Sequence, residues 1–170
     1  MVLELGKAGS SGVGKGVLPV LRDGVVVATL QASSWTESAT AVLGDRRWVF
    51  GKRKGVLTAR WEVDPEETAR LRAEQTSWWK GTWTVELTGG ALQVESVSWW
   101  KGTHRFLADG REVARGGTTG GWSPRPTLTV DVELPLDEQV FLLWLLLVVG
   151  RRNQAAALTG TGVTVTGGSS

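Results

Sequence analysis

The residue types that could bind an anionic partner are concentrated in one short stretch of this 170-residue chain. Between residues 46 and 60 there are six basic side chains and no acidic one. Exposed like charges repel, so such a cluster suggests an anionic partner, and an anionic lipid surface stabilises each nearby Lys or Arg by ~1 kcal/mol. The alternative is a solvated hairpin whose lysines protect a sheet edge. Both interpretations stay open. The candidate residues are Arg46, Arg47, Lys52, Arg53 and Lys54, the last three between Gly51 and Gly55 at an expected hairpin tip.

Tryptophan offers a second candidate chemistry, since the chain has ten Trp, three Phe and no Tyr. The hexapeptide SWWKGT occurs at residues 77–82 and again at 98–103. In a functional interpretation its indoles form a stacking surface for sugars or bases, with Lys80 and Lys101 beside them. In a structural interpretation the copies are equivalent corners of a closed sheet, which we favour because two copies fall short of a repeat array. The four residues of the functional interpretation are Trp78, Trp79, Trp99 and Trp100.

Two further features of the sequence lack residues that the functional sites they resemble would require. GSSGVGKG, residues 9–16, approaches a phosphate-binding loop, but Gly16 lacks the hydroxyl that would hold magnesium and VLPV does not begin a helix. We expect a flexible segment over residues 1–16 instead. His104 is the single histidine and there is no cysteine, so neither a zinc site nor a nucleophile elbow is indicated. The sequence predicts no catalytic residue, no metal, no cofactor and no enzymatic activity.

Length and composition limit the functional classes that remain. The length suits a single domain, and a net charge of +2 is too small to indicate nucleic-acid binding. The absence of cysteine fits a cytoplasmic protein. The first residues, MVLELGKAGSSG, show no secretory signal.

The elements that must position these residues are mostly strands. From residue 17 onward, short apolar runs alternate with turn residues such as Asp23-Gly24, which predicts about ten to twelve antiparallel strands. One short surface helix is expected, because Asp64, Pro65, Glu66 and Glu67 suit a helix start and ETARLRAEQ continues it through residue 75.

Residues 140–149, VFLLWLLLVV, form the longest apolar run. A membrane span needs about 20 apolar residues, so this run is too short and we predict no transmembrane segment. Its leucines favour a helix over about 136–150, and a helix apolar around its whole circumference must be surrounded. The sequence therefore predicts a mainly β fold, in which a closed antiparallel barrel of 10–12 strands over residues 17–152 surrounds a C-terminal helix. A polar flexible tail over 153–170 is expected to follow.

THRFLADGREVARGG and GWSPRPTLTVDVELPLDEQVFLLWLLLVVGRR resemble bacterial members of the tubby C-terminal domain superfamily, which includes phospholipid scramblases and LURP-one-related proteins. In those proteins a strand, an Asp-Gly turn and two more strands lead into a buried helix. The resemblance covers roughly residues 17–152, and the chain is shorter than typical tubby domains. No phosphoinositide-binding motif is matched residue by residue, so no family site is transferred.

The resemblance implies a non-enzymatic barrel that binds lipid or an anionic membrane surface, located in the cytoplasm and peripherally at the membrane. Arg46, Arg47 and the basic hairpin would supply the contact. The alternative is a carbohydrate- or protein-interaction module that uses the two SWWKGT segments. The sequence does not predict an oligomeric state.

Overall fold

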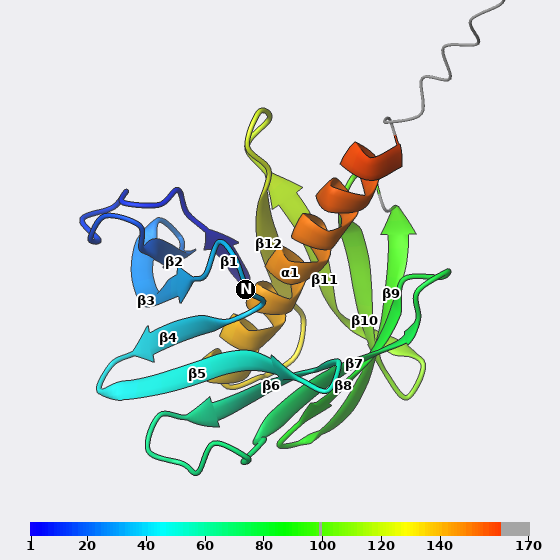
Figure 1. Ribbon diagram of the computed structural model, residues 1–170, viewed down its shortest axis with the longest axis horizontal. Helices are drawn as coiled ribbons and strands as arrows, with labels where there is room; N and C mark the ends of the chain where they lie inside the picture. The colour runs from blue at the N-terminus through cyan, green and yellow to red at the C-terminus, as the bar shows by residue number, and fades with distance from the viewer. Residues whose placement is uncertain (99, 161–170) are drawn as a thin grey trace, which may run out of the picture.

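The computed structural model describes residues 1–98 and 100–160, and these residues form twelve strands and one helix (Figure 1). The helix is α1 (Leu136–Gly160). The strands are β1 (Val2–Leu5), β2 (Leu18–Arg22), β3 (Val25–Ala32), β4 (Ala39–Leu43), β5 (Arg46–Arg53), β6 (Val56–Trp61), β7 (Leu71–Ser77), β8 (Thr82–Leu87), β9 (Gly90–Ser98), β10 (Thr103–Ala108), β11 (Arg111–Thr119) and β12 (Arg125–Val130).

The strands form one closed barrel with a simple up-and-down order. Each strand pairs antiparallel with the next, and β1 pairs with β12 in a register that sets Leu3 opposite Leu128. Closure leaves no free sheet edge. The prediction of a closed antiparallel barrel with a C-terminal helix is confirmed.

Local sequence explains the strands and turns. Alternate side chains of β8, Trp83 and Val85, point into the barrel and are buried, as a period of two requires. Asp23 and Gly24 have φ values of 51° and 77°, the geometry of a tight hairpin turn whose twist suits the flanking strands.

Helix α1 fills the barrel. Seven consecutive residues, 140–146, are buried, so every side of this segment faces protein. The ring of Phe50 on β5 lies 5.5 Å from that of Phe141 and 5.2 Å from that of Trp144. On β11 the helix comes so close that a Cβ at Gly116 would lie 2.7 Å from Leu146. A barrel of this many strands is too wide to be filled by its own side chains, and the helix supplies the missing core.

The helix is longer than the apolar run that predicted it. It enters the barrel after β12 and continues past Gly150, where most of its residues are exposed. By length and composition the segment Leu136–Thr159 could also cross a membrane, although half of its most apolar window is buried inside the protein.

The predicted surface helix at residues 64–75 is wrong. Asp64 instead holds a turn: its carboxylate accepts hydrogen bonds from the Trp61 amide at 3.0 Å and from Arg70 Nε at 2.6 Å. Leu71 and Ala73 are buried while Arg72 and Glu74 are exposed, a strand alternation that becomes β7. The acidic turn resembles a helix cap because both need a carboxylate that accepts backbone N–H groups.

Two boundaries also differ from the predictions. Residues 2–5, expected to be flexible, form β1, which pairs with both neighbouring strands and buries Leu3 and Leu5. The tail expected from residue 153 begins instead as the last turns of α1, and residues 161–170 lie outside the described part of the chain.

Candidate functional site

The up-and-down order sorts the connections between strands into two sets, because every second connection returns to the same end of the barrel. We call one the tryptophan end; its connections are residues 6–17, 33–38, 54–55, 78–81, 99–102 and 120–124. We call the other the acidic end; its connections are residues 23–24, 44–45, 62–70, 88–89, 109–110 and 131–135. Helix α1 enters at the acidic end and leaves through the tryptophan end (Figure 1).

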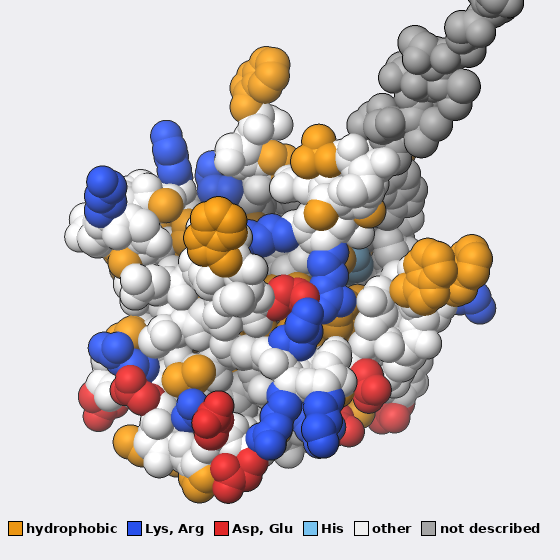
Figure 2. Space-filling view, viewed as in Figure 1, with side chains coloured by type: hydrophobic (Ala, Val, Ile, Leu, Met, Phe, Trp, Pro, Cys, Tyr) orange, Lys and Arg blue, Asp and Glu red, His pale blue; other side chains and the backbone are white. Residues whose placement is uncertain are grey.

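Charge separates the two ends. The tryptophan-end connections carry five lysines and one acidic residue, Glu37, whereas the acidic-end connections carry nine acidic residues and one basic residue, Arg70. Acidic side chains accordingly gather along the lower edge of the face shown in Figure 2. The five lysines are Lys7, Lys15, Lys54, Lys80 and Lys101.

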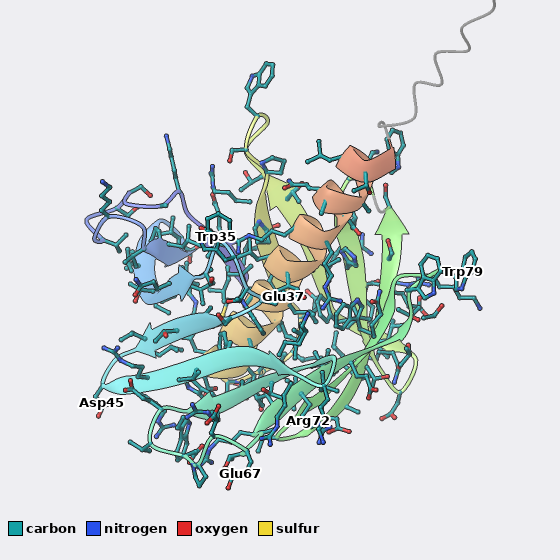
Figure 3. The ribbon with its side chains drawn as sticks, viewed as in Figure 1. Trp35, Glu37, Asp45, Glu67, Arg72 and Trp79 are labelled. Carbon is teal, nitrogen blue, oxygen red and sulfur yellow. The ribbon has the colours of Figure 1, made fainter. Side chains whose placement is uncertain are left out.

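The exposed tryptophans follow the same division. Within residues 1–98 and 100–160, every exposed Trp lies in a tryptophan-end connection, and Trp35 and Trp122 are the most exposed at 96% and 103%. In Figure 3 Trp35 and, at the right, Trp79 lie above Asp45 and Glu67, which are on the lower side of the barrel. Leaving such large apolar rings in water is unfavourable, so five of them on one end indicate a contact surface. The five are Trp35, Trp78, Trp79, Trp100 and Trp122.

The two SWWKGT copies form the β7–β8 and β9–β10 hairpin connections of this end. Gly81 and Gly102 have φ values of 62° and 65°, so these glycines supply the bends at the two corners. The rings of Trp78 and Trp79 stack on each other with centroids 4.2 Å apart. The corners therefore agree with the structural interpretation, and Trp78, Trp79 and Trp100, on which the functional interpretation depends, are exposed. Trp99 lies outside the described residues.

Between these hairpins and α1 lies a cavity of about 530 Å³. Trp78, Trp79 and Trp100 contribute aromatic walls, and helix α1 contributes Arg152 and Asn153. A cavity of this size at the mouth of a barrel is a common form of ligand site. The other lining residues are Gln75, Lys80, Gly81, Trp83, Ser96, Val97, Ser98, His104 and Val149.

The inner part of this cavity is polar but carries little charge. Burial lowers the pKa of His104, while a hydrogen bond to the Gly102 carbonyl opposes that shift, so the imidazole is neutral at pH 7. Nδ1 lies 3.3 Å from that carbonyl oxygen and must therefore carry the ring proton, which leaves Nε2 as an acceptor. Trp83 Nε1 and Ser98 Oγ are buried without a hydrogen-bond partner.

Glu37 connects the β3–β4 connection to α1 at this end. Its carboxylate binds Arg152 at 2.6 Å and Lys52 at 2.7 Å. Burial alone would raise the pKa of Glu37, but hydrogen bonds from Lys52 and Arg152 bring it below the usual value. Arg151 adds a hydrogen bond of 2.8 Å to the carbonyl of Ser33. These contacts hold the segment that carries Trp35 against the helix.

The five basic residues singled out from the sequence do not form one cluster. Arg46 lies over the Trp61 ring at 4.3 Å and Arg47 pairs with Glu62 at 3.5 Å, both at the acidic end of β5. At the other end of this eight-residue strand, Lys52 is bound to Glu37, while Arg53 and Lys54 are exposed at the tryptophan end. Roughly 3.3 Å per residue separates the two groups by about 20 Å.

No sequence motif singled out Trp35, Trp122, Lys7 or Lys15 as a contact residue. The signal was available in the order of the connections, because lysine- or tryptophan-bearing turns alternate along the chain with acidic turns such as Asp23-Gly24. In an up-and-down barrel, this alternation places the lysine- and tryptophan-bearing turns at one end and the acidic turns at the other.

The fold and this surface define a class of protein: a closed twelve-stranded antiparallel barrel with an internal helix and one end rich in tryptophan and lysine. Comparison of the chain with protein-family models, curated proteins and solved structures finds no match. Over the described residues no group of three His, Cys, Asp or Glu side chains is placed to hold a metal ion.

Proposed function

We propose that this protein is a non-enzymatic barrel that binds anionic membrane surfaces peripherally, with its tryptophan end facing the lipid. The observation that carries the proposal is the location of the exposed indoles and the five loop lysines on one end, opposite an end that is strongly acidic. A cytoplasmic location at the inner membrane surface belongs to the same proposal, since anionic lipids face the cytoplasm.

Each half of this surface has a physical role. Indole rings prefer the boundary between headgroups and hydrocarbon, where the ring is buried and the N–H stays in a polar layer. Each Lys near an anionic surface contributes ~1 kcal/mol, and an acidic end is repelled by the same surface. Together these terms favour binding and fix its orientation.

The resemblance to the tubby-like superfamily supports the proposal, because it implies a lipid-related role. The contact surface differs from the one expected from the sequence. The exposed Arg53 and Lys54 belong to it, whereas Arg46 and Arg47 contact residues of the acidic end.

Flotation with vesicles tests the proposal. Wild-type protein should float with phosphatidylcholine vesicles that contain phosphatidylserine, and far less with phosphatidylcholine alone or at high salt. Replacing Lys7, Lys15 and Lys54 together by Gln should weaken partitioning by about a hundredfold, as expected for the loss of ~3 kcal/mol.

The matched control removes three exposed arginines near the acidic end, Arg47, Arg72 and Arg111, also by Gln. Both triple variants lower the net charge equally, so a general charge effect would weaken both alike. Equal losses, or no flotation of the wild type at low salt, would contradict the proposal. Protein that leaves membranes only with detergent would instead make α1 a membrane anchor.

A further inference from the structure

The cavity between the SWWKGT hairpins has a chemistry that membrane binding by charge and indoles does not use. Its outer walls are the exposed rings of Trp78, Trp79 and Trp100, and Trp83 lies deeper at 1% exposure. The lining also contains five side chains that form hydrogen bonds without carrying charge at pH 7. These are Gln75, Ser96, Ser98, His104 and Asn153.

The hydrogen-bonding groups of this lining are mixed. The indole Nε1 of Trp83 can only donate, and it is buried without a partner. The neutral His104 offers an acceptor at Nε2, and the Ser98 hydroxyl, also unpartnered, can do both. A ligand that pairs with such a mixed lining must itself carry both donors and acceptors. Hydroxyl groups have this property.

A phosphate fits this lining poorly. Its oxygens mainly accept, so the acceptor nitrogen of His104 would remain without a donor. Arg152 is the deeper of the two cations in the lining, and its Nε and Nη2 are already bound to Glu37 at 2.7 and 2.6 Å. Lys80 is exposed at the rim.

We propose that this cavity binds the hydroxylated ring of a sugar, with its C–H face on the indole walls and its hydroxyl groups toward the uncharged polar side chains of the lining. An indole provides a flat apolar surface for the C–H face of such a ring. The volume of about 530 Å³ is large enough for a monosaccharide unit with ordered water. This site is additional to the membrane contact and does not require it.

The sugar could be free or could be the headgroup of a glycolipid, because the cavity opens at the end proposed to face the membrane. The recognised chemistry is the same in both cases. Vesicles distinguish the sources, since a glycolipid would add to membrane partitioning whereas a soluble glycoside would compete for the cavity without increasing flotation.

The first test uses the indole N–H signals of ¹⁵N-labelled protein, which resolve individual tryptophans by NMR. The probes are the methyl glycosides of glucose, galactose, mannose and N-acetylglucosamine, with inorganic phosphate as the anionic comparison. The signal of Trp83 is assigned by its loss in Trp83→Phe. At least one glycoside should shift the signals of Trp83 and Trp100 in a saturable manner and leave those of Trp35 and Trp122 unchanged.

Variants then locate the site. Trp100→Ala and Asn153→Ala should each weaken the glycoside titration about tenfold, whereas Trp122→Ala, an exposed residue outside the cavity, should not change it. Unchanged affinity in both cavity variants would overturn the proposal. So would a panel in which no glycoside shifts the Trp83 signal, or in which phosphate shifts it more than every glycoside does.

Flotation separates this inference from the proposed function. Vesicles of phosphatidylcholine and phosphatidylserine without glycolipid report membrane binding alone, and the NMR titration without vesicles reports the cavity alone. Stronger flotation on adding a monoglycosyl diacylglycerol, reversed by Trp100→Ala more than by Trp122→Ala, would identify the glycolipid as the source. Saturable glycoside shifts without that increase would identify a soluble sugar.

Discussion

The two ends of the barrel have the same number of connections and opposite surfaces. At the tryptophan end the connections expose indoles and lysines, and α1 emerges among them. At the acidic end the connections expose carboxylates, and no Trp occurs in any of their sequences. Fold stability does not require this separation, since tight turns accept many polar residues at either end. The separation is what the proposed membrane contact requires, since one end would face the lipid and the other would be repelled by it.

Each end also has a carboxylate that holds one of its connections, and the two differ in how they are embedded. Glu37 is half-buried and joins a connection to the internal helix. Asp64 closes only its own connection, through Arg70 and the Trp61 amide. We expect replacement of Glu37 to lower the stability of the whole molecule, and replacement of Asp64 to affect mainly the turn at residues 62–70.

The largest effect is expected from Leu143→Asp, which tests whether α1 forms the core of the barrel that carries the two ends. Leu143 is completely buried inside the barrel, and a carboxylate there has no partner. The free energy of unfolding should fall by about 4 kcal/mol or more, with loss of β structure by circular dichroism. A variant that becomes more soluble than the wild type and keeps its fold would contradict the internal position of α1.

The next effect concerns the indoles. Trp35→Ala with Trp122→Ala should weaken partitioning to anionic vesicles by tenfold or more, as roughly 1–2 kcal/mol is lost for each buried ring. Thermal stability should stay unchanged because both rings are exposed. Val25→Ala with Val63→Ala is the control, since these exposed side chains lie at the acidic end. Equal losses in the two double variants would remove the distinction between the ends.

Glu37→Gln should lower the free energy of unfolding by about 1–2 kcal/mol, because Arg152 and Lys52 lose a charged partner. The folded state lowers the pKa of Glu37, so its contribution is present above the unfolded pKa and is lost as pH falls through the folded pKa. Denaturant melts at pH 7 and pH 3 should show the difference from wild type at pH 7 and little of it at pH 3. A difference that is constant with pH would contradict an ionic role.

The smallest effect is expected from Asp64→Asn. Hydrogen bonds with Arg70 hold the pKa of Asp64 below its usual range, but the bonds of its carboxylate stay within residues 61–70, so global stability should change less than in Glu37→Gln. Hydrogen exchange should become faster at the Trp61 amide and in residues 62–70, without reaching the tryptophan end. Faster exchange in residues 33–38 would show that the two ends are coupled.

Much of the fold could be predicted because the strongest patterns were unambiguous. A leucine-rich run too apolar to face water required an enclosing sheet, and short strands between tight turns supplied it. The helix expected at residues 64–75 failed because DPEE is equally suited to an acidic turn, and the alternation in Leu71–Glu74 was overlooked. The site was harder to predict, since Trp35, Trp122 and the paired hairpins are far apart in sequence and meet only when the barrel closes.

Closure has a consequence for how the chain is synthesised. Strand β1 pairs with β12, more than a hundred residues later, and α1 follows all twelve strands. A chain emerging from the ribosome therefore has neither a closed ring nor a core until both arrive, and bringing such distant segments together is entropically costly. Until then its strand edges and apolar faces are open to other chains. We expect the barrel to close only after synthesis. During translation the open strand edges would need protection from other chains, and this need increases as more strands emerge.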